Sequence, residues 1–230
     1  MKRVLLYILL LTAFELSIAA QDTAFDASKL PERAAKPEAF VPAGWKVEAI
    51  AKGDLNGDKK PDLAIKIALV DTSKESGIGG DRALVVVFAD GDQWKRVATG
   101  PSILQCPECG GAFYGVIDAP ADVEIEKGGV IAIENEHGSR NVDTSDYKFR
   151  FDKKSGRFVL IGFDFTDNDR LTGVLTTEST NYLTNVRITK TGKGKRTRIK
   201  RTVIKRTKIY LEDADELGIE DQALHRLGLD

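Results

Sequence analysis

Short apolar runs with a period of two make up most of the chain after Trp45. The first four cover 47–51, 63–70, 83–89 and 94–99, and turn-forming residues separate them. Alternation with this period is typical of β-strands that bury one face. The run at 83–89 is apolar almost throughout, which predicts a central strand buried on both faces. We therefore expect a four-stranded antiparallel meander in this part of the chain.

A second set of alternating runs follows Pro120. Its members lie at 121–126, 130–134, 146–151 and 157–165, and further β-like runs follow at 184–189 and 196–211. The fold is therefore predicted to be mainly β. We expect two four-stranded meanders packed as a sandwich or a partly open barrel, with additional C-terminal strands. Two meanders are too few for a closed propeller.

The two ends of the chain differ from this β domain, which we place at 41–211. Residues 1–20 combine a basic start, an apolar run and small residues near the end, which predicts a signal peptide. We therefore expect a secreted or periplasmic protein with no membrane span after signal cleavage. Residues 21–40 are polar and contain two prolines, which predicts a mobile lead-in. The acidic tail at 212–230 has a weak helical spacing at 217–229, typical of a short final helix.

The segment 53–65 carries the strongest candidate chemistry. Its oxygen-bearing side chains occupy the first, third, fifth and ninth places of a tight loop, and a backbone carbonyl is available at the seventh. These places are filled by Asp54, Asn56, Asp58, Lys60 (the carbonyl) and Asp62. Calcium takes six to eight oxygen ligands at about 2.3–2.6 Å, and without a cation the three carboxylates repel one another. The alternative is a turn whose Asp and Asn side chains cap their own backbone.

This loop resembles the calcium loop of integrin-type FG-GAP repeats and of the related VCBS repeats, which read Asp-x-Asn-x-Asp-Gly-x-x-Asp between two strands. The resemblance implies one weak Ca²⁺ site in a unit at about 45–100. Lys59 stands where the repeats have Gly, and a positive φ at such a residue costs about 1–2 kcal/mol. An EF-hand fits less well, because Ile65 occupies the place of its bidentate Glu. The loop and the motifs Gln-Cys-Pro-Glu-Cys-Gly-Gly and Ser-Thr-Asn-Tyr-Leu-Thr also resemble a group of exported bacterial proteins of unassigned function.

The two cysteines of the chain lie close together, at Cys106 and Cys109. In an oxidising compartment such a pair favours a local disulfide. A thiol–disulfide enzyme would need a helix after the first Cys, which Gly110 and Gly111 disfavour. A zinc site would need four ligands, and both histidines are distant in sequence. One of them, His137, lies among carboxylates, which is typical of a polar loop between strands and less often of a general base or metal ligand.

The net charge of −1 gives no overall attraction to nucleic acid or to membranes, so we expect no nucleic-acid partner. The charges are nevertheless uneven. The segment 187–208 is rich in Lys and Arg and has no acid, whereas the tail at 212–230 is mostly acidic. The interpretation we favour is an edge strand that its charges protect from pairing with other chains. The alternative is a binding site for a polyanion.

These features lead to one main hypothesis and two alternatives. The main hypothesis is an exported, non-catalytic, calcium-binding β module that binds another macromolecule, either a protein or a polysaccharide. The alternatives are a polyanion-binding protein that uses the basic strand at 187–208 and a thiol–disulfide enzyme that uses the Cys pair. A nucleophile elbow, a phosphate-binding loop and a metalloprotease helix motif are all absent from the sequence, so a binding role is favoured over an enzymatic one.

Overall fold

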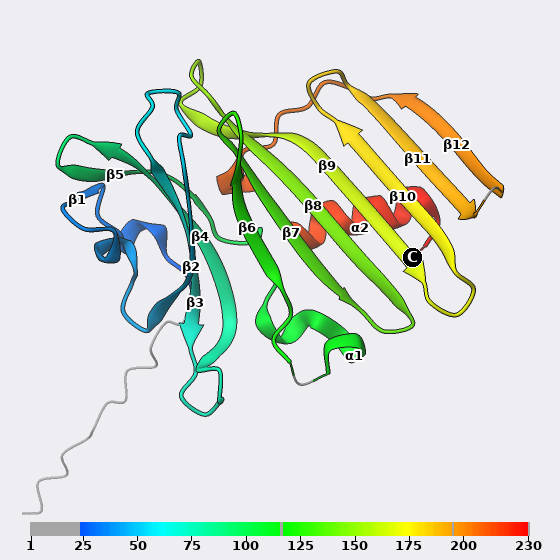
Figure 1. Cartoon of the computed structure of the whole chain (residues 1–230), viewed down its shortest axis with the longest axis horizontal. Helices are drawn as coiled ribbons and strands as arrows, with labels where there is room; N and C mark the ends of the chain where they lie inside the picture. The colour runs from blue at the N-terminus through cyan, green and yellow to red at the C-terminus, as the bar shows by residue number, and fades with distance from the viewer. Residues whose placement is uncertain (1–23, 116, 195, 230) are drawn as a thin grey trace, which may run out of the picture.

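The computed structural model describes residues 24–115, 117–194 and 196–229, so the predicted signal peptide lies outside the described residues. The chain forms two antiparallel sheets (Figure 1). The five-stranded sheet has the order β1-β5-β4-β3-β2. Its strands are β1 (Arg33–Ala34), β2 (Trp45–Gly53), β3 (Asp62–Val70), β4 (Ile78–Asp90) and β5 (Gln93–Gly100).

The seven-stranded sheet is one continuous meander with the order β12-β11-β10-β9-β8-β7-β6. Its strands are β6 (Ala121–Glu126), β7 (Val130–Gly138), β8 (Asn141–Asp152), β9 (Arg157–Asp169), β10 (Val174–Asn181), β11 (Val186–Lys193) and β12 (Arg196–Val203). The helical segments are η1 (Ala27–Lys29), η2 (Pro37–Phe40), η3 (Pro107–Gly110), α1 (Gly111–Tyr114), η4 (Leu211–Asp213) and α2 (Glu216–Leu227).

The predicted fold class is confirmed, since both meanders are present and the sheets do not close into a barrel. Two features of the C-terminal strands differ from the prediction. The last strand ends at Val203 rather than at Leu211, and β10 was not predicted. The side chains that β10 buries are Thr176, Glu178 and Thr180. Because its inner face is polar, this strand lacks the apolar alternation that identifies the others.

The main apolar core lies between the two sheets and continues beneath α2. It contains Leu84 from β4, Ile131 from β7 and Phe163 from β9. Ile219 and Ala223 of α2 join the same cluster, and the helix lies across β8, β9 and β10 (Figure 1). The seven-stranded sheet is thus covered partly by the other sheet and partly by the final helix, which confirms the short helix predicted near the C-terminus.

A second apolar cluster covers the opposite face of the five-stranded sheet. Ile65 and Val85 point into it from β3 and β4, so β4 is buried on both faces as predicted. Leu30 and Phe40 cover this cluster and are 5% and 0% exposed. The prediction of a mobile lead-in at 21–40 is therefore wrong for its described residues, because their few apolar side chains complete a core that β3 and β4 leave open.

A buried ionic group joins the five-stranded sheet to the connection between the sheets. Arg82 donates to both carboxylate oxygens of Glu48, at 2.8 Å each, and Lys66 Nζ lies 3.1 Å from the same carboxylate. Arg82 also donates to the carbonyls of Gln105 and Ala119, at 3.0 and 2.7 Å. Because a buried guanidinium needs such partners, these bonds fix both ends of the segment that contains the cysteines.

Candidate functional sites

The predicted calcium loop connects β2 to β3, and its side chains bind its own backbone. The Asp54 carboxylate accepts hydrogen bonds from the backbone N–H groups of Gly57 at 2.7 Å, Asp58 at 3.2 Å and Lys59 at 2.8 Å. Asn56 accepts from the N–H of Asp58, and Asp58 accepts from the N–H of Lys60, both at 2.8 Å. Desolvation alone would raise the pKa of the Asp54 carboxyl, but the N–H donors lower it.

The backbone of this loop has two residues with a positive φ. Lys59 has a φ of 68°, which is the left-handed conformation expected at the sixth place. Gly57 also has a positive φ, of 82°. The hydrogen bonds that the Asp and Asn side chains accept from the backbone hold Lys59 in this unusual conformation. Lys59 thus adopts the positive φ that the resemblance implies for this place.

Asp62, the residue at the ninth place, is fully buried. Its carboxylate oxygens accept from the N–H groups of Leu55 and Ala89, at 2.9 Å each. Burial, followed by the charges of Asp58 and Asp54, raises its pKa. Within the part of the chain that the structure describes, these three carboxylates do not form a group whose ligand atoms all lie within 4.8 Å of one another. In this structure the side-chain oxygens of the loop are arranged as caps of its own backbone.

The cysteine segment contains the predicted disulfide, between Cys106 and Cys109. The expectation that no helix follows Cys106 is wrong, because η3 begins at Pro107 and α1 follows it. The fixed φ of Pro107 suits the first position of a helix. Gly111, with a φ of 67°, separates the two short helices. Cys109 is exposed, so another thiol has access to this disulfide.

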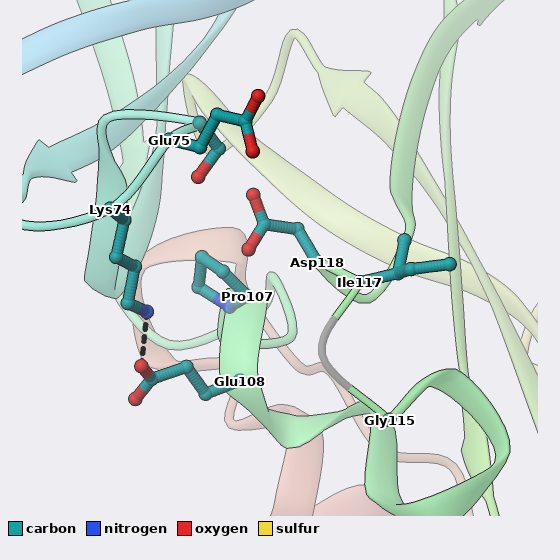
Figure 2. Close-up of a pocket in the computed structure, with 8 residues that line it drawn as sticks. Lys74, Glu75, Pro107, Glu108, Gly115, Ile117 and Asp118 are labelled. Atoms are coloured by element: carbon teal, nitrogen blue, oxygen red, sulfur yellow. Dashed lines mark ion pairs between the residues drawn. The ribbon is translucent and has the colours of Figure 1, made fainter.

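An open pocket of about 800 Å³ lies beside this disulfide segment. Figure 2 shows Lys74 paired with Glu108 across one side, and the carboxylates of Glu75 and Asp118 on the other. Ile117 also lines the pocket and is 69% exposed. The lining offers charged groups for a polar ligand, and we assign it no reaction.

The basic segment at 187–208 forms a two-stranded ribbon of β11 and β12 at one edge of the seven-stranded sheet (Figure 1). We call β11 and β12 together the basic ribbon. Every residue of β12 is exposed. The first cation of β11, Arg187, instead turns inward and lies 3.0 Å from Glu178. Among the described residues, no ion pair joins an acid of the tail to the basic ribbon.

His137 was expected in a polar loop, but it lies in β7, which extends to Gly138. Its ring meets Glu220 of α2. The sequence offered only an indirect signal for this contact, since it depends on strand register and on the docking of the final helix. The inward-facing polar residues at 135, 137, 143 and 145 do follow the period of two, and this pattern marks a polar inner surface.

Comparison with protein-family models, with curated proteins and with solved structures found no match to this chain. In the described ranges, no helix has the length and apolar character needed to cross a membrane.

Proposed function

We propose that this chain is an exported binding protein whose basic ribbon binds an extended anionic polymer, such as an acidic polysaccharide. The observation that carries the proposal is a row of cations on one face of the ribbon. Arg196, Arg198 and Lys200 alternate along β12, and Lys193 of β11 lies directly opposite Arg196. Successive cations on β12 are about 6.4–6.8 Å apart, because a strand rises 3.2–3.4 Å per residue. Such a row can follow the charges of an extended polymer.

The exposure of the ribbon favours this function over a protected edge strand. A protected edge still buries one face of its strand against the core. Here, no described residue of β11 or β12 belongs to either apolar cluster. Ordering backbone costs roughly 1–2 kcal/mol per residue, and burial does not offset that cost in β12. The four cations of the row have no ion-pair partner in the described part of the chain. Lys193 Nζ donates to the Thr172 carbonyl at 2.7 Å. The three cations of β12 are exposed and available to a polyanion.

The experiment is a salt series on immobilised heparin, with neutral dextran as the control matrix. We expect the logarithm of affinity to fall linearly with the logarithm of salt concentration. Replacing Arg196, Arg198 and Lys200 by Gln should reduce the slope by about 2–3, since each lost phosphate-like contact contributes about 0.7–0.9.

The matched control replaces three exposed lysines elsewhere, Lys36, Lys95 and Lys127, by Gln. This variant has the same net charge as the first one, and it should keep the wild-type slope. The proposal is wrong if the two triple variants have the same salt slope. It is also wrong if the wild type is not retained on heparin at about 150 mM salt and the ribbon variant only loses solubility. The second result would restore the protected-edge interpretation.

A second candidate function is calcium binding by the loop at 54–62, within an exported module. The φ of 68° at Lys59 favours it, because the chain adopts the backbone path of a calcium loop without the usual glycine. The disulfide supports an oxidising compartment. The ligands are proposed to be Asp54, Asn56, Asp58, the Lys60 carbonyl and Asp62. The test is the thermal response to Ca²⁺ described in the Discussion.

A further inference from the structure

Three titratable side chains stand in one row across neighbouring strands of the seven-stranded sheet. His137 of β7 lies opposite Asp143 of β8, and Asp143 lies opposite Asp167 of β9. Residues that are directly opposite each other have Cβ atoms about 4.5–5.5 Å apart on one face of the sheet. The antiparallel register therefore brings an imidazole and two carboxyl groups together.

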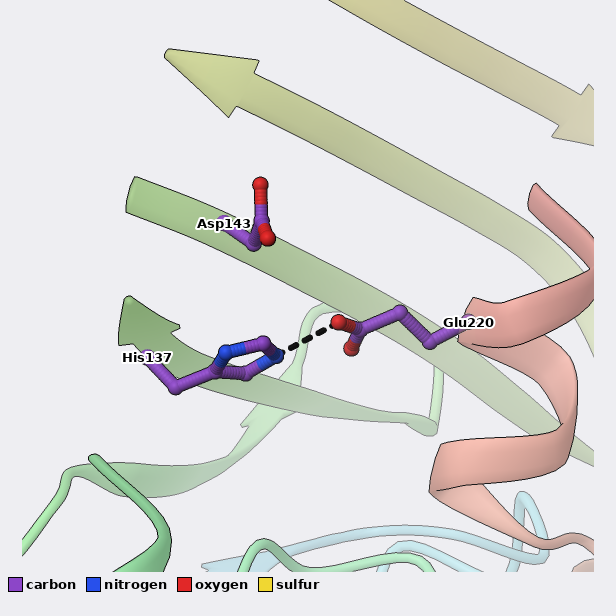
Figure 3. Close-up of side chains that lie close together, drawn as sticks. All are labelled: His137, Asp143 and Glu220. Atoms are coloured by element: carbon purple, nitrogen blue, oxygen red, sulfur yellow. Dashed lines mark hydrogen bonds and ion pairs between the residues drawn. The ribbon is translucent and has the colours of Figure 1, made fainter. Parts of the chain in front are cut away.

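The final helix adds a further carboxylate to this row (Figure 3). Glu220 of α2 points at His137, with Oε1 at 2.5 Å from Nε2. Its other oxygen accepts a hydrogen bond from Ser145 Oγ at 2.9 Å. His137, Asp143 and Glu220 can each offer one ligand atom so that all three atoms lie within 4.8 Å of one another. Two ligands at 2.0–2.2 Å from one ion are separated by at most about 4.4 Å, so small side-chain rotations suffice.

Two oxygen atoms at this site are buried without a partner. Asp143 Oδ1 and Glu216 Oε1 accept no hydrogen bond in the structure. Glu216 is only 5% exposed, and it lies one turn before Glu220 on α2. An unpartnered buried polar group costs about 1–3 kcal/mol. These oxygens are therefore poised to accept a cation.

The site also contains more acidic groups than basic ones, because four carboxyl groups lie near a single imidazole. Burial, and then the neighbouring Asp167, raises the pKa of Asp143 to about 7. Burial, and then the charge of Glu220, raises the pKa of Glu216 to about 7. The hydrogen bond to Glu220 raises the pKa of His137. A divalent cation held between these side chains would offset the negative charge of the carboxylates.

We infer that His137, Asp143 and Glu220 bind a first-row divalent transition-metal ion, with Zn²⁺ as the ion that best suits them. Zinc accepts imidazole nitrogen together with carboxylate oxygen, whereas Ca²⁺ prefers oxygen ligands alone. The His137 side chain is 27% exposed and that of Glu220 is 3% exposed, so the ion enters from the side of the imidazole. Ser145 orients Glu220, and Asn141 Nδ2 holds Asp167 at 2.6 Å.

The test is calorimetric titration of the metal-free, disulfide-bonded chain with Zn²⁺. We expect one equivalent to bind. His137→Gln and Glu220→Gln should each weaken the affinity at least about tenfold, since even outer partners of a metal site contribute 10–100-fold. Glu220→Gln keeps the shape of the side chain and a carbonyl that accepts from Ser145. His225→Gln, at the other histidine of the chain, and Asp58→Ala, in the loop, are the matched controls and should leave Zn²⁺ affinity unchanged.

Cobalt provides a second measurement that a merely structural role would not affect. Co²⁺ bound to the wild type should give visible absorption bands, and His137→Gln should shift or remove them because a nitrogen ligand is lost. The inference is overturned if the folded wild type binds no Zn²⁺ at 100-fold molar excess. It is also overturned if Glu220→Gln, folded by circular dichroism, binds Zn²⁺ as tightly as the wild type, or if His225→Gln weakens binding as much as His137→Gln does.

Discussion

The loop at 54–62 and the cluster beneath α2 both gather carboxylates, but they compensate the charge in different ways. In the loop, backbone N–H groups supply the compensation, three to Asp54 and two to Asp62. In the cluster, the oxygens Asp143 Oδ1 and Glu216 Oε1 have no partner. Backbone donors stay in place whether or not an ion is bound. The carboxylates of Asp54 and Asp62 therefore have hydrogen-bond donors without a metal, whereas the two buried oxygens of the cluster have none.

The largest effect that separates the two regions should come from Asp62→Ala. Its side chain is the acceptor for two backbone N–H groups, so its loss should lower the free energy of unfolding by about 2–6 kcal/mol, at 1–3 kcal/mol for each unpaired group. Asp143→Asn removes a charge from a crowded row, and in the metal-free protein it should be neutral or stabilising. Urea unfolding in EDTA measures both changes. If both variants lowered the free energy of unfolding by similar amounts, the proposed difference between the loop and the cluster would be wrong.

The next effect is a pH dependence of stability that comes from the cluster. The pKa of Asp143 and that of Glu216 are raised to about 7, so the folded state holds protons that the unfolded state has lost. Stability from these groups is present below about pH 4 and is lost as pH rises to 7, by up to about 1.4 kcal/mol per pH unit for each proton. The pKa of His137 is also raised, which acts in the same direction.

Urea unfolding of the metal-free chain from pH 5 to pH 8 checks this sign. Asp143→Asn should make the pH dependence shallower. Asp54 has the opposite sign, because its pKa is lowered and its contribution is lost as pH falls below about 4. If the wild type becomes more stable between pH 5 and pH 8, the account of the cluster is wrong.

The smallest effect should be the response of the loop to calcium. With a dissociation constant of roughly 10⁻³ M, 10 mM Ca²⁺ stabilises the protein by about 1.4 kcal/mol. The melting temperature should rise accordingly, and Asp58→Ala should abolish the rise while the protein stays folded. Glu220→Gln should keep the calcium response, since it lies outside the loop. An unchanged melting temperature across millimolar Ca²⁺ in the wild type would remove the calcium site from consideration.

Local patterns in the sequence predicted the parts of the fold that local physics decides. Alternation predicted the two meanders, and the Asp and Asn spacing predicted a tight loop, while the positive φ at its sixth residue was implied by the resemblance. The cluster could not be predicted in this way, because Asp143 meets His137 only through strand register, and Glu220 arrives from the last helix. The described lead-in was misjudged for a related reason, since Leu30 and Phe40 bind a sheet face formed by strands later in the chain.

The order of the elements has a consequence for biosynthesis, because α2 follows all seven strands of the larger sheet. A ribosome releases the seven strands of the larger sheet before it releases Glu216–Leu227, so the polar row on β7, β8 and β9 is complete before its cover is. During that interval the face of β8–β10 that α2 later covers, with its buried aromatic residues on β8 and β9 and its polar row, is open to chaperones and proteases. Docking of α2 closes this face and supplies Glu220 in one step. A chain with α2 docked therefore exposes less of this sheet face than a chain that lacks α2. The same docking step would complete the proposed metal site.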